Sequence, residues 1–579
     1  MFQRLVKRTV WLLVILLFLS VETFPAGNRK AQKKEVEKFV AGFSLAVPAR
    51  STPSVVDSHQ ESSSVLFSLS GNDNNPGGEF FLPIPEFERV RNYRPRWGRA
   101  GLEFALLMSY SQARYWIRYS RFIEDWQFRL TWADQKRRFF TTEALRFDSN
   151  AFYLNWHHAF AGMIYYEFAR TNSLSFWQSA IFSIGGSLYW EYLVEWREVI
   201  SINDNLMTGL GGLSLGEAWF QMGRYFHNSQ NPAGRLLSWL NPFLKVNGWL
   251  DRKKPLSAYH HNYNQAAQDV YLFLGYRNAP ISASPAENTG NLALSLHSRI
   301  ITDSSYGLPG RVDEKFSSPF YSQLDFDFMF HGTTREELGV TAKIVPLGRF
   351  RQNISPDRKG FSLYYGLGSA FFQYVKRPIT DYDAGQIPVN KPEDFHFELP
   401  RDFRDKLAAV HLIGPVAEVV WYSGPWKFRL KAEAYPSFGM INSLPLNRFS
   451  EDHDIRGLKT TVKFYGYHYA FGPDLESLAE IHFRQLRLSA FFSYVYYRSL
   501  QGLDRYQTLP ENEQILPLTD DSVLLDSRWH YGAAFEVRIP RTLFSLRGSI
   551  EGVRRWGRVH ELEERTLEKR YYLGLKYRI

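Results

Sequence analysis

The sequence predicts an α+β chain in which a helical module over residues 101–230 precedes a C-terminal antiparallel transmembrane β-barrel over residues 266–579. Three observations lead to this fold class. The mean hydropathy is −0.32, and no internal apolar run reaches the roughly 18 residues of a membrane-spanning helix. Aromatic residues make up 16% of the chain, too many for a disordered protein. The second half alternates apolar and polar residues, as strands with one face toward lipid and one toward a wet lumen do.

The first 26 residues are expected to be a secretory signal peptide. Arg4, Lys7 and Arg8 precede the apolar run 10–19, which is too short to span a bilayer comfortably. A retained signal anchor is the alternative, because no clean small-x-small cleavage site follows the run, and both interpretations export the rest of the chain. Residues 27–100 are rich in Ser, Asn, Pro and Gly and are expected to form a flexible leader.

Composition excludes several classes of function. The net charge of +10 over 579 residues is a mild basic bias, compatible with anionic lipid or polysaccharide. No nucleic-acid-binding motif accompanies it, so nucleic acid is not expected as a partner. The chain has no cysteine, which excludes disulfides, thiolate metal sites and a cysteine nucleophile. No cofactor motif or metal-ligand spacing occurs, and neither a cofactor nor a metal is expected.

Apolar residues in the helical module recur at intervals of three and four. This spacing predicts helices over about 102–132, 144–169, 173–197 and 205–226. Ser173, Ser175 and the run 201–204 carry the short oxygen-bearing side chains that cap helix starts. The third helix has no formal charge between residues 174 and 190, and a helix that is apolar all round is buried in protein or lipid. Residues 231–265 are expected to be a linker to the barrel.

Polar residues stand out against this apolar background, and each needs a partner or water. Glu191 and Glu195 lie four apart on one helix face, where their charges repel unless a cation or a proton neutralises them. His157, His158 and Arg170 on the preceding helix are the nearest candidates. The predicted polar cluster comprises Arg170, Glu191, Glu195, Ser201, Asn203, Asp204 and Glu217.

Two interpretations of this cluster remain open. In the first, His157 or His158 acts as a base or ligand beside Glu191, Glu195 and Asp204 in a hydrolytic or metal site. In the second, which we favour, the cluster is a buried ion-pair network that sets the register of the helices. No spacing here is specific for a catalytic triad or a metal.

The glycines of the fourth predicted helix indicate close packing. Gly209, Gly212 and Gly216 fall on nearly one face, and the Gly-x-x-x-Gly spacing lets a second helix approach closely. A phosphate-binding loop is the weaker alternative, because no strand precedes the glycines and no lysine follows them.

The module contains the runs Trp156–Gly162, Tyr189–Tyr192, Ser201–Asp204 and Gly211–Glu217. With these residues, about 145–226 resembles an uncharacterised bacterial envelope family, catalogued as a domain of unknown function, whose members resemble outer-membrane proteins. The sequence departs from the family at Met207-Thr208-Gly209, where members tend to carry a proline. The resemblance implies location and architecture, and it implies no activity.

Strand-like alternation recurs throughout the second half. It is clearest at 426–434, where Trp426, Phe428 and Leu430 alternate with Lys427 and Arg429. Similar segments occupy 270–277, 292–300, 324–330, 338–345, 361–371, 407–421, 458–469, 478–483, 486–496, 529–539, 544–552 and 571–579. They indicate about twelve spanning strands of about 9 to 11 residues or more each. The final aromatic-rich strand, ending at Ile579, resembles the signal read by the barrel-assembly machinery, which is expected as a partner together with outer-membrane lipid.

We therefore expect a bacterial outer-membrane barrel with a passage, binding or structural role and with the helices in or beneath its lumen. The alternative is an envelope hydrolase of lipid or glycan that uses the helical histidine and carboxylate residues. The lumen is expected to be either a cationic wall or a salt-bridged surface. The lysines and arginines expected to face it are Lys427, Arg429, Lys431, Arg528, Arg538, Lys576 and Arg578.

Overall fold

A computed structural model describes most of the chain from residue 94 onward. The described residues are 94–119, 130–148, 152, 154–229, 232–252, 267–278, 291–303, 305–332, 334–376, 405–446, 448–449, 467–501 and 523–579. All of them belong to one compact unit. The predicted signal peptide and the predicted leader up to residue 93 lie outside the described residues.

The second half forms a closed antiparallel β-barrel. Its strands are β3 Gln268–Asn278, β4 Asn291–Ile301, β6 Tyr321–His331, β7 Thr334–Ile354, β8 Lys359–Lys376, β9 Lys406–Ser423, β10 Trp426–Asn442, β11 Tyr467–Phe483, β12 Leu486–Ser499, β13 Leu524–Arg538, β14 Phe544–Val559 and β15 Leu562–Arg578. Pairing of β3 with β15 and of β7 with β8 closes the ring. The sheet has 13 strands in all, and the twelve listed here remain when the accessory strand β5 is set aside. The predicted fold class and strand number are confirmed.

Strand β5, Gly310–Ser317, was not predicted from the sequence. It pairs only with the second part of β7, from Gly348 to Ile354, whereas β6 pairs with the first part of β7 up to Val345. β7 is therefore long enough to hold two partners in succession along one edge. The predicted segments 458–469 and 478–483 were counted separately, but residues 467–469 and 478–483 both belong to the single strand β11. Residues 458–466 lie outside the described residues.

Alternation along each strand separates a polar inner face from an apolar outer face. On β10, Arg429 is 5% exposed inside the barrel, whereas Phe428 is 38% exposed outside it. Glu418 of β9 and Glu480 of β11, on the strands beside β10, turn inward toward Arg429. This arrangement is the reverse of a soluble sandwich, in which the apolar faces meet in the core.

The helical module runs from Trp97 to Leu250, further than the predicted 101–230. Its elements are α3 Trp97–Tyr119, α4 Trp132–Phe140, β1 Leu145–Arg146, α5 Leu154–Thr171, α6 Phe176–Tyr189, the π-helix η3 Trp190–Val194, β2 Ile200–Ser201, α7 Ile202–Asn205, the π-helix η4 Leu206–Gly211, α8 Gly212–Asn228, α9 Pro232–Leu237, the 3-10 helix η5 Ser238–Leu240 and α10 Pro242–Leu250. Among the described helices, none has the length and apolar character needed to cross a membrane alone.

The prediction of a linker over 231–265 is wrong for its first part, which folds into α9, η5 and α10. Pro232 and Pro242 start helices here, at positions where the missing N–H costs nothing. The Asn241 side chain accepts a hydrogen bond from the Leu244 amide at 2.9 Å and caps α10. Leu237 and Leu240 join the hydrophobic core of the module, so this segment is part of it.

The helical module packs against the outer wall of the barrel, and its predicted place in or beneath the lumen is wrong. Asp325 and Asp327 of β6 line the central cavity, so Phe326 between them points outward. The ring of Trp219 on α8 meets Phe326 edge-on at 5.6 Å between centroids. The outward faces of β6 and β7 are apolar and need a cover, and the apolar side of α8 provides it.

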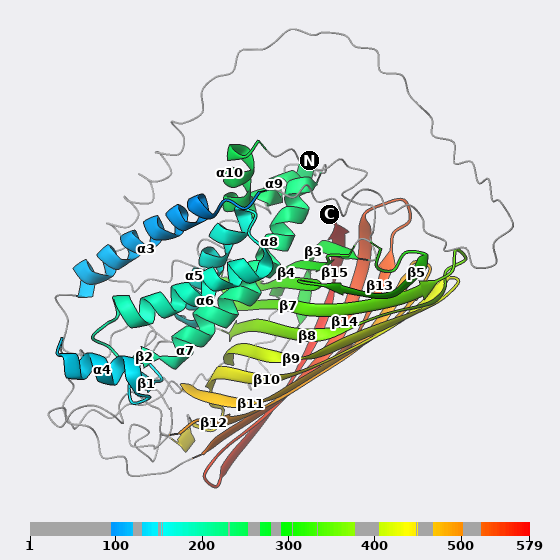
Figure 1. Cartoon of the computed structure of the whole chain (residues 1–579). Helices are drawn as coiled ribbons and strands as arrows, with labels where there is room; N and C mark the ends of the chain where they lie inside the picture. The colour runs from blue at the N-terminus through cyan, green and yellow to red at the C-terminus, as the bar shows by residue number, and fades with distance from the viewer. Residues whose placement is uncertain are drawn as a thin grey trace. The chain divides into compact units, whose positions relative to one another are not determined.

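The covered residues follow one row of strand partners across the sheet. Leu272 of β3 pairs with Leu296 of β4, which pairs with Phe326 of β6, which pairs with Val340 of β7. All four belong to the same core cluster as α5 and α8. Figure 1 shows α8 beside β4 and β7, where this row passes. The row continues to β10 and β11, where Phe147 stacks on Phe438 and Tyr469 at 5.7 and 5.0 Å.

Candidate functional site

Part of the predicted polar cluster gathers around α7 and its cap. Ser201 caps the N-terminus of α7: its hydroxyl accepts a hydrogen bond from the Asp204 amide at 3.2 Å. The same hydroxyl donates to the Asn203 side-chain oxygen at 3.0 Å, and that oxygen also accepts from the Asp148 amide at 2.8 Å. Tyr469 of β11 donates to the Asp148 carbonyl at 3.0 Å. These bonds tie the cluster to the end of the barrel wall at which β11 begins.

Glu191 and Glu195 lie beside this cap, at the π-helix η3 that continues α6. Glu191 is buried and accepts a hydrogen bond from the Ser201 amide at 2.8 Å. Glu195 accepts one from the Trp190 indole at 2.8 Å. Burial first, and then the neighbouring carboxylates, raise the pKa of both groups well above that of a free glutamate. The site therefore favours protons on this pair rather than two negative charges.

Arg138 of α4 is a buried cation beside the pair, and it was not among the predicted site residues. It is 1% exposed, and its Nη2 donates to the main-chain oxygen of Glu191. Its Nε and Nη1 find no hydrogen-bond partner among the described residues. Burial lowers its pKa, and Glu191, Glu195 and Glu198 act in the opposite sense. Charged residues are frequent in α4, and Arg138 follows Lys136 and Arg137 directly. No sequence pattern therefore marks Arg138 as buried.

His158 reaches Asp204 and Thr208, whereas His157 is half-buried on the same helix. The Nε2 atom of His158 lies 3.3 Å from Asp204 Oδ1. Its Nδ1 atom lies 3.4 Å from the Thr208 hydroxyl. A hydroxyl, an imidazole and a carboxylate thus stand in sequence, in the order used by nucleophilic hydrolases. Thr208 is only 6% exposed.

Arg170 and Glu217 form a second, separate cluster, and the expected pairing of Arg170 with Glu191 and Glu195 is not found. Arg170 Nε lies 3.0 Å from Glu217 Oε2, and Tyr166 and Gln221 also donate to Glu217. Glu217 is 0% exposed, so these donors compensate the loss of water around its charge. The group joins α5 to α8 in the interior of the module.

Gly212 and Gly216 of α8 face α5, whereas Gly209 of η4 faces α6. A Cβ atom on Gly212 would stand 2.5 Å from the Cα of Gly162, closer than two carbons can approach. One on Gly216 would stand 2.8 Å from the Tyr166 ring. Gly209 has more room, with its nearest neighbour, Ile184, at 3.8 Å. Gly162 is the matching glycine on the partner helix.

The lumen is lined by charged side chains that are paired with one another. A cavity of about 560 Å³ runs along it, and its lining includes Lys343, Glu433, Glu476 and Arg487. Among the residues expected to form a cationic wall, several are paired with carboxylates: Arg429 with Glu418 and Glu480, Lys431 with Glu433, Arg528 with Asp405 and Asp526, and Lys576 with Glu536 and Asp269. The salt-bridged alternative therefore describes the lumen better than a cationic wall.

Some of these pairs cross the lumen. Lys376 of β8 pairs with Glu568 of β15, and Arg570 donates to the Tyr374 hydroxyl at 2.8 Å. β8 and β15 are separated around the ring by β7, β6, β4 and β3. The contacts consequently narrow the passage at this level. At another level of the lumen, His411, Asp474 and Glu476 lie together, but Lys343 already pairs with Glu476, so its ammonium group occupies the place of a cation there.

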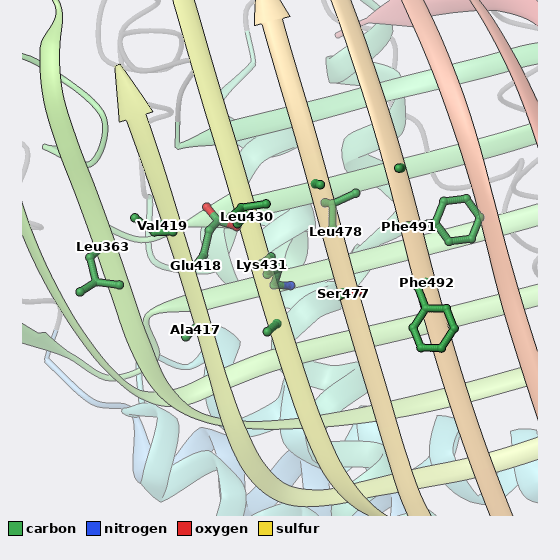
Figure 2. Close-up of a pocket in the computed structure, with 13 residues that line it drawn as sticks. Leu363, Ala417, Glu418, Val419, Leu430, Lys431, Ser477, Leu478, Phe491 and Phe492 are labelled. Atoms are coloured by element: carbon green, nitrogen blue, oxygen red, sulfur yellow. The ribbon is translucent and has the colours of Figure 1, made fainter. Parts of the chain in front are cut away.

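A shallow depression of about 500 Å³ lies on the outer wall between Leu363 and Phe492 (Figure 2). It arises because small residues fall opposite one another on neighbouring strands. Ala432 pairs with Ala417 on one side and with Ser477 on the other. Its lining is apolar at the surface, so the depression suits hydrocarbon rather than a polar substrate.

Comparison with known protein families identifies one region of the chain. A family described as Domain of unknown function (DUF3943) matches residues 144–243, which contain α5 to α9 and both polar clusters. The predicted resemblance over 145–226 to a domain of unknown function is confirmed. The match to DUF3943 also includes the start of α10, beyond the predicted limit.

Solved structures similar to the barrel are outer-membrane proteins of low sequence identity. The beta domain of the Bordetella autotransporter BrkA is 10% identical, with 54% of this chain and 99% of that chain covered and a TM-score of 0.18. Omp33 of Acinetobacter baumannii is 7% identical, with 54% and 100% covered and a TM-score of 0.17. The translocator domain of NalP from Neisseria meningitidis is 8% identical, with 55% and 90% covered and a TM-score of 0.16. No curated protein matches the chain. Because these TM-scores are low, the barrel assignment rests on strand pairing.

Proposed function

We propose that this protein is an integral barrel of the bacterial outer membrane that passes small polar solutes. The observation that carries the proposal is the inverted polarity of the closed barrel. Arg429 and Glu480 are buried inside, while Phe428, Leu488 and Leu573 are exposed outside. Water does not favour such an outer surface, and hydrocarbon does.

The location follows from the same surface and from the N-terminal sequence. Export by the predicted signal peptide and insertion by the barrel-assembly machinery would deliver the chain to the outer membrane. The test is fractionation of cell envelopes followed by gel migration with and without heating. We expect an outer-membrane band that migrates faster before heating. Recovery from the aqueous fraction, with migration independent of heating, would contradict the proposal.

The passage is supported by the charged cavity along the lumen. Its volume of about 560 Å³ suits small hydrated solutes, and its walls carry both signs of charge. The purified protein in lipid vesicles should admit arabinose and exclude large dextrans. Vesicles made without the protein serve as the control. If arabinose enters no faster than into those vesicles, the barrel has a binding or structural role instead.

A hydrolase is the second candidate, favoured by the order Thr208, His158, Asp204. It ranks second because both contacts are long, at 3.4 and 3.3 Å, and Thr208 is nearly buried. The test replaces Glu191, Glu195 and Asp204 singly by their amides and compares the lipid composition of the envelope. Each variant must first show heat-dependent migration. Unchanged lipid chemistry in all three variants would exclude the hydrolase.

A further inference from the structure

Helix α6 has its polar and apolar faces reversed relative to a helix on the surface of a soluble protein. Its buried side carries Ser179, Ser183 and Ser187, spaced four apart. The Ser183 hydroxyl donates toward the main-chain oxygens of Thr208 and Gly209, at 3.2 and 3.1 Å. Its exposed side carries large apolar residues, and Ile181 is 65% exposed. Small and hydroxyl-bearing residues at a helix interface are typical of packing within a membrane.

The outer face of α3 is also apolar. Leu102, Leu106, Tyr110 and Ile117 follow the spacing of one helix face, and Leu106 is 63% exposed. α3 packs against α6 through Phe104, whose ring meets Phe182 edge-on at 5.6 Å. The exposed apolar residues of the two helices are Trp97, Leu102, Leu106, Tyr110, Ile117, Trp177, Ile181, Ile184 and Leu188. We call this set the outer helical face.

The outer helical face lies on helices that are stacked over a part of the barrel that would otherwise meet lipid. Phe326 and Phe328 of β6 and Val340 of β7 point outward, but the helices beneath this face bury them. On the adjoining strands, Leu274 of β3 and Leu292 of β4 are exposed. The apolar outer surface of the barrel therefore continues from uncovered strands on to helices.

We propose that the outer helical face lies in the hydrocarbon of the bilayer and is occupied by lipid acyl chains. The proposal rests on the membrane location proposed above. It commits to lipid because the face continues the lipid-facing wall, and because residues 176–189 of α6 carry no charged side chain. Arg170 and Glu217 of the module turn inward to pair with each other, whereas Arg114, near the C-terminal end of α3, is exposed. The lipid-facing surface of the protein would thus be made partly of strands and partly of helices.

Single cysteines can test this directly, because the chain has none of its own. The variants Ile181→Cys and Leu106→Cys place a fluorophore on the outer helical face. Leu573→Cys, on the exposed side of β15, reports the strand wall, and Asp357→Cys, in a turn, reports the aqueous surface. The full chain is reconstituted in vesicles of phosphatidylcholine, with a nitroxide quencher on the acyl chains or with aqueous iodide. All four variants must first show heat-dependent migration.

We expect acyl-chain nitroxide to quench positions 181, 106 and 573 several-fold more strongly than position 357. Iodide should quench position 357 most strongly. If position 573 is quenched by lipid but positions 181 and 106 are not, the inference is wrong while the membrane barrel stands. Shielding of 181 and 106 from both quenchers would identify a protein cover, another part of this chain or a partner, in place of lipid. Quenching of all four positions by iodide alone would overturn both proposals.

Discussion

At the scale of single residues, Gly212 sets how closely α8 approaches α5. An added Cβ would meet the Gly162 backbone at 2.5 Å, and a backbone cannot rotate away as a side chain can. Gly212→Ala should therefore destabilise the helical module by about 1 to 3 kcal/mol, the usual cost of overpacking. The measurement is denaturant unfolding in detergent, followed by tryptophan fluorescence. Gly209→Ala, with 3.8 Å to its nearest neighbour, is the control, and an equal loss in both variants would contradict the close approach.

Glu191 makes the stability of the module depend on pH. Its pKa is raised, so the folded state favours the neutral acid. That contribution is complete below the unfolded pKa of about 4.3 and is lost as the pH rises through the raised folded value. Amides 191–205 should accordingly exchange hydrogen faster at pH 9 than intrinsic rates explain, and Glu191→Gln should weaken this dependence. Glu143→Gln, at an exposed position, is the control. A pH dependence identical in all three proteins would show that Glu191 does not titrate in this range.

At the scale of elements, β5 is an accessory to the ring. It pairs with β7 alone, whereas every strand of the ring has a neighbour on each side. Proline lacks the N–H of a ladder bond and is tolerated only at edges. Phe316→Pro in β5 should leave heat-dependent migration intact, and Phe492→Pro in β12 should abolish it. Both residues are exposed phenylalanines, so loss of migration in both variants would make β5 essential to closure.

The strands could be predicted from the sequence because their two faces meet different surroundings. Phe428 and Arg429 alternate for this reason, and the same pattern marked nearly every strand of the ring. The pattern cannot tell whether an outward residue meets lipid or helix, since Phe326 under α8 and Phe428 on the open wall are equally apolar. The helices were expected in or beneath the lumen because a barrel of about twelve strands is wide enough to hold them, and the strand pattern could not correct that expectation.

The candidate site was predicted less completely than the fold. Glu191, Glu195 and Asp204 stood out because isolated charges in an apolar stretch need partners. Some of the groups around them come from distant segments, such as Arg138 of α4, and local spacing carries no information about these groups. Arg170 was assigned to the wrong carboxylates because sequence proximity was the only guide, whereas helix packing brings it to Glu217.

At the scale of the whole molecule, the ion pairs that cross the lumen narrow it. Lys376 and Glu568 link opposite parts of the wall. Replacing both, Lys376→Met with Glu568→Gln, should raise single-channel conductance in planar bilayers, because the link across the lumen is lost. Arg570, which also pairs with Glu568, keeps its hydrogen bond to the Tyr374 hydroxyl at 2.8 Å. The control is Lys359→Met with Asp357→Asn, a pair in an exposed turn with 2.9 Å between its charged atoms. Equal conductance in the wild type and the crossing-pair variant would show that this pair does not constrict the route.

The contact between helices and outer wall also constrains how the chain is made. α8 packs against β4, β6, β7 and β8, and the Tyr225 hydroxyl donates to the main-chain oxygen of Ile579. The helices precede those strands in the chain and leave the ribosome first. If the chain is exported as proposed, Trp219 and its neighbours would cross the inner membrane before the strands that cover them. A holding chaperone would then have to shield the helices, and their docking would be among the last steps of biogenesis.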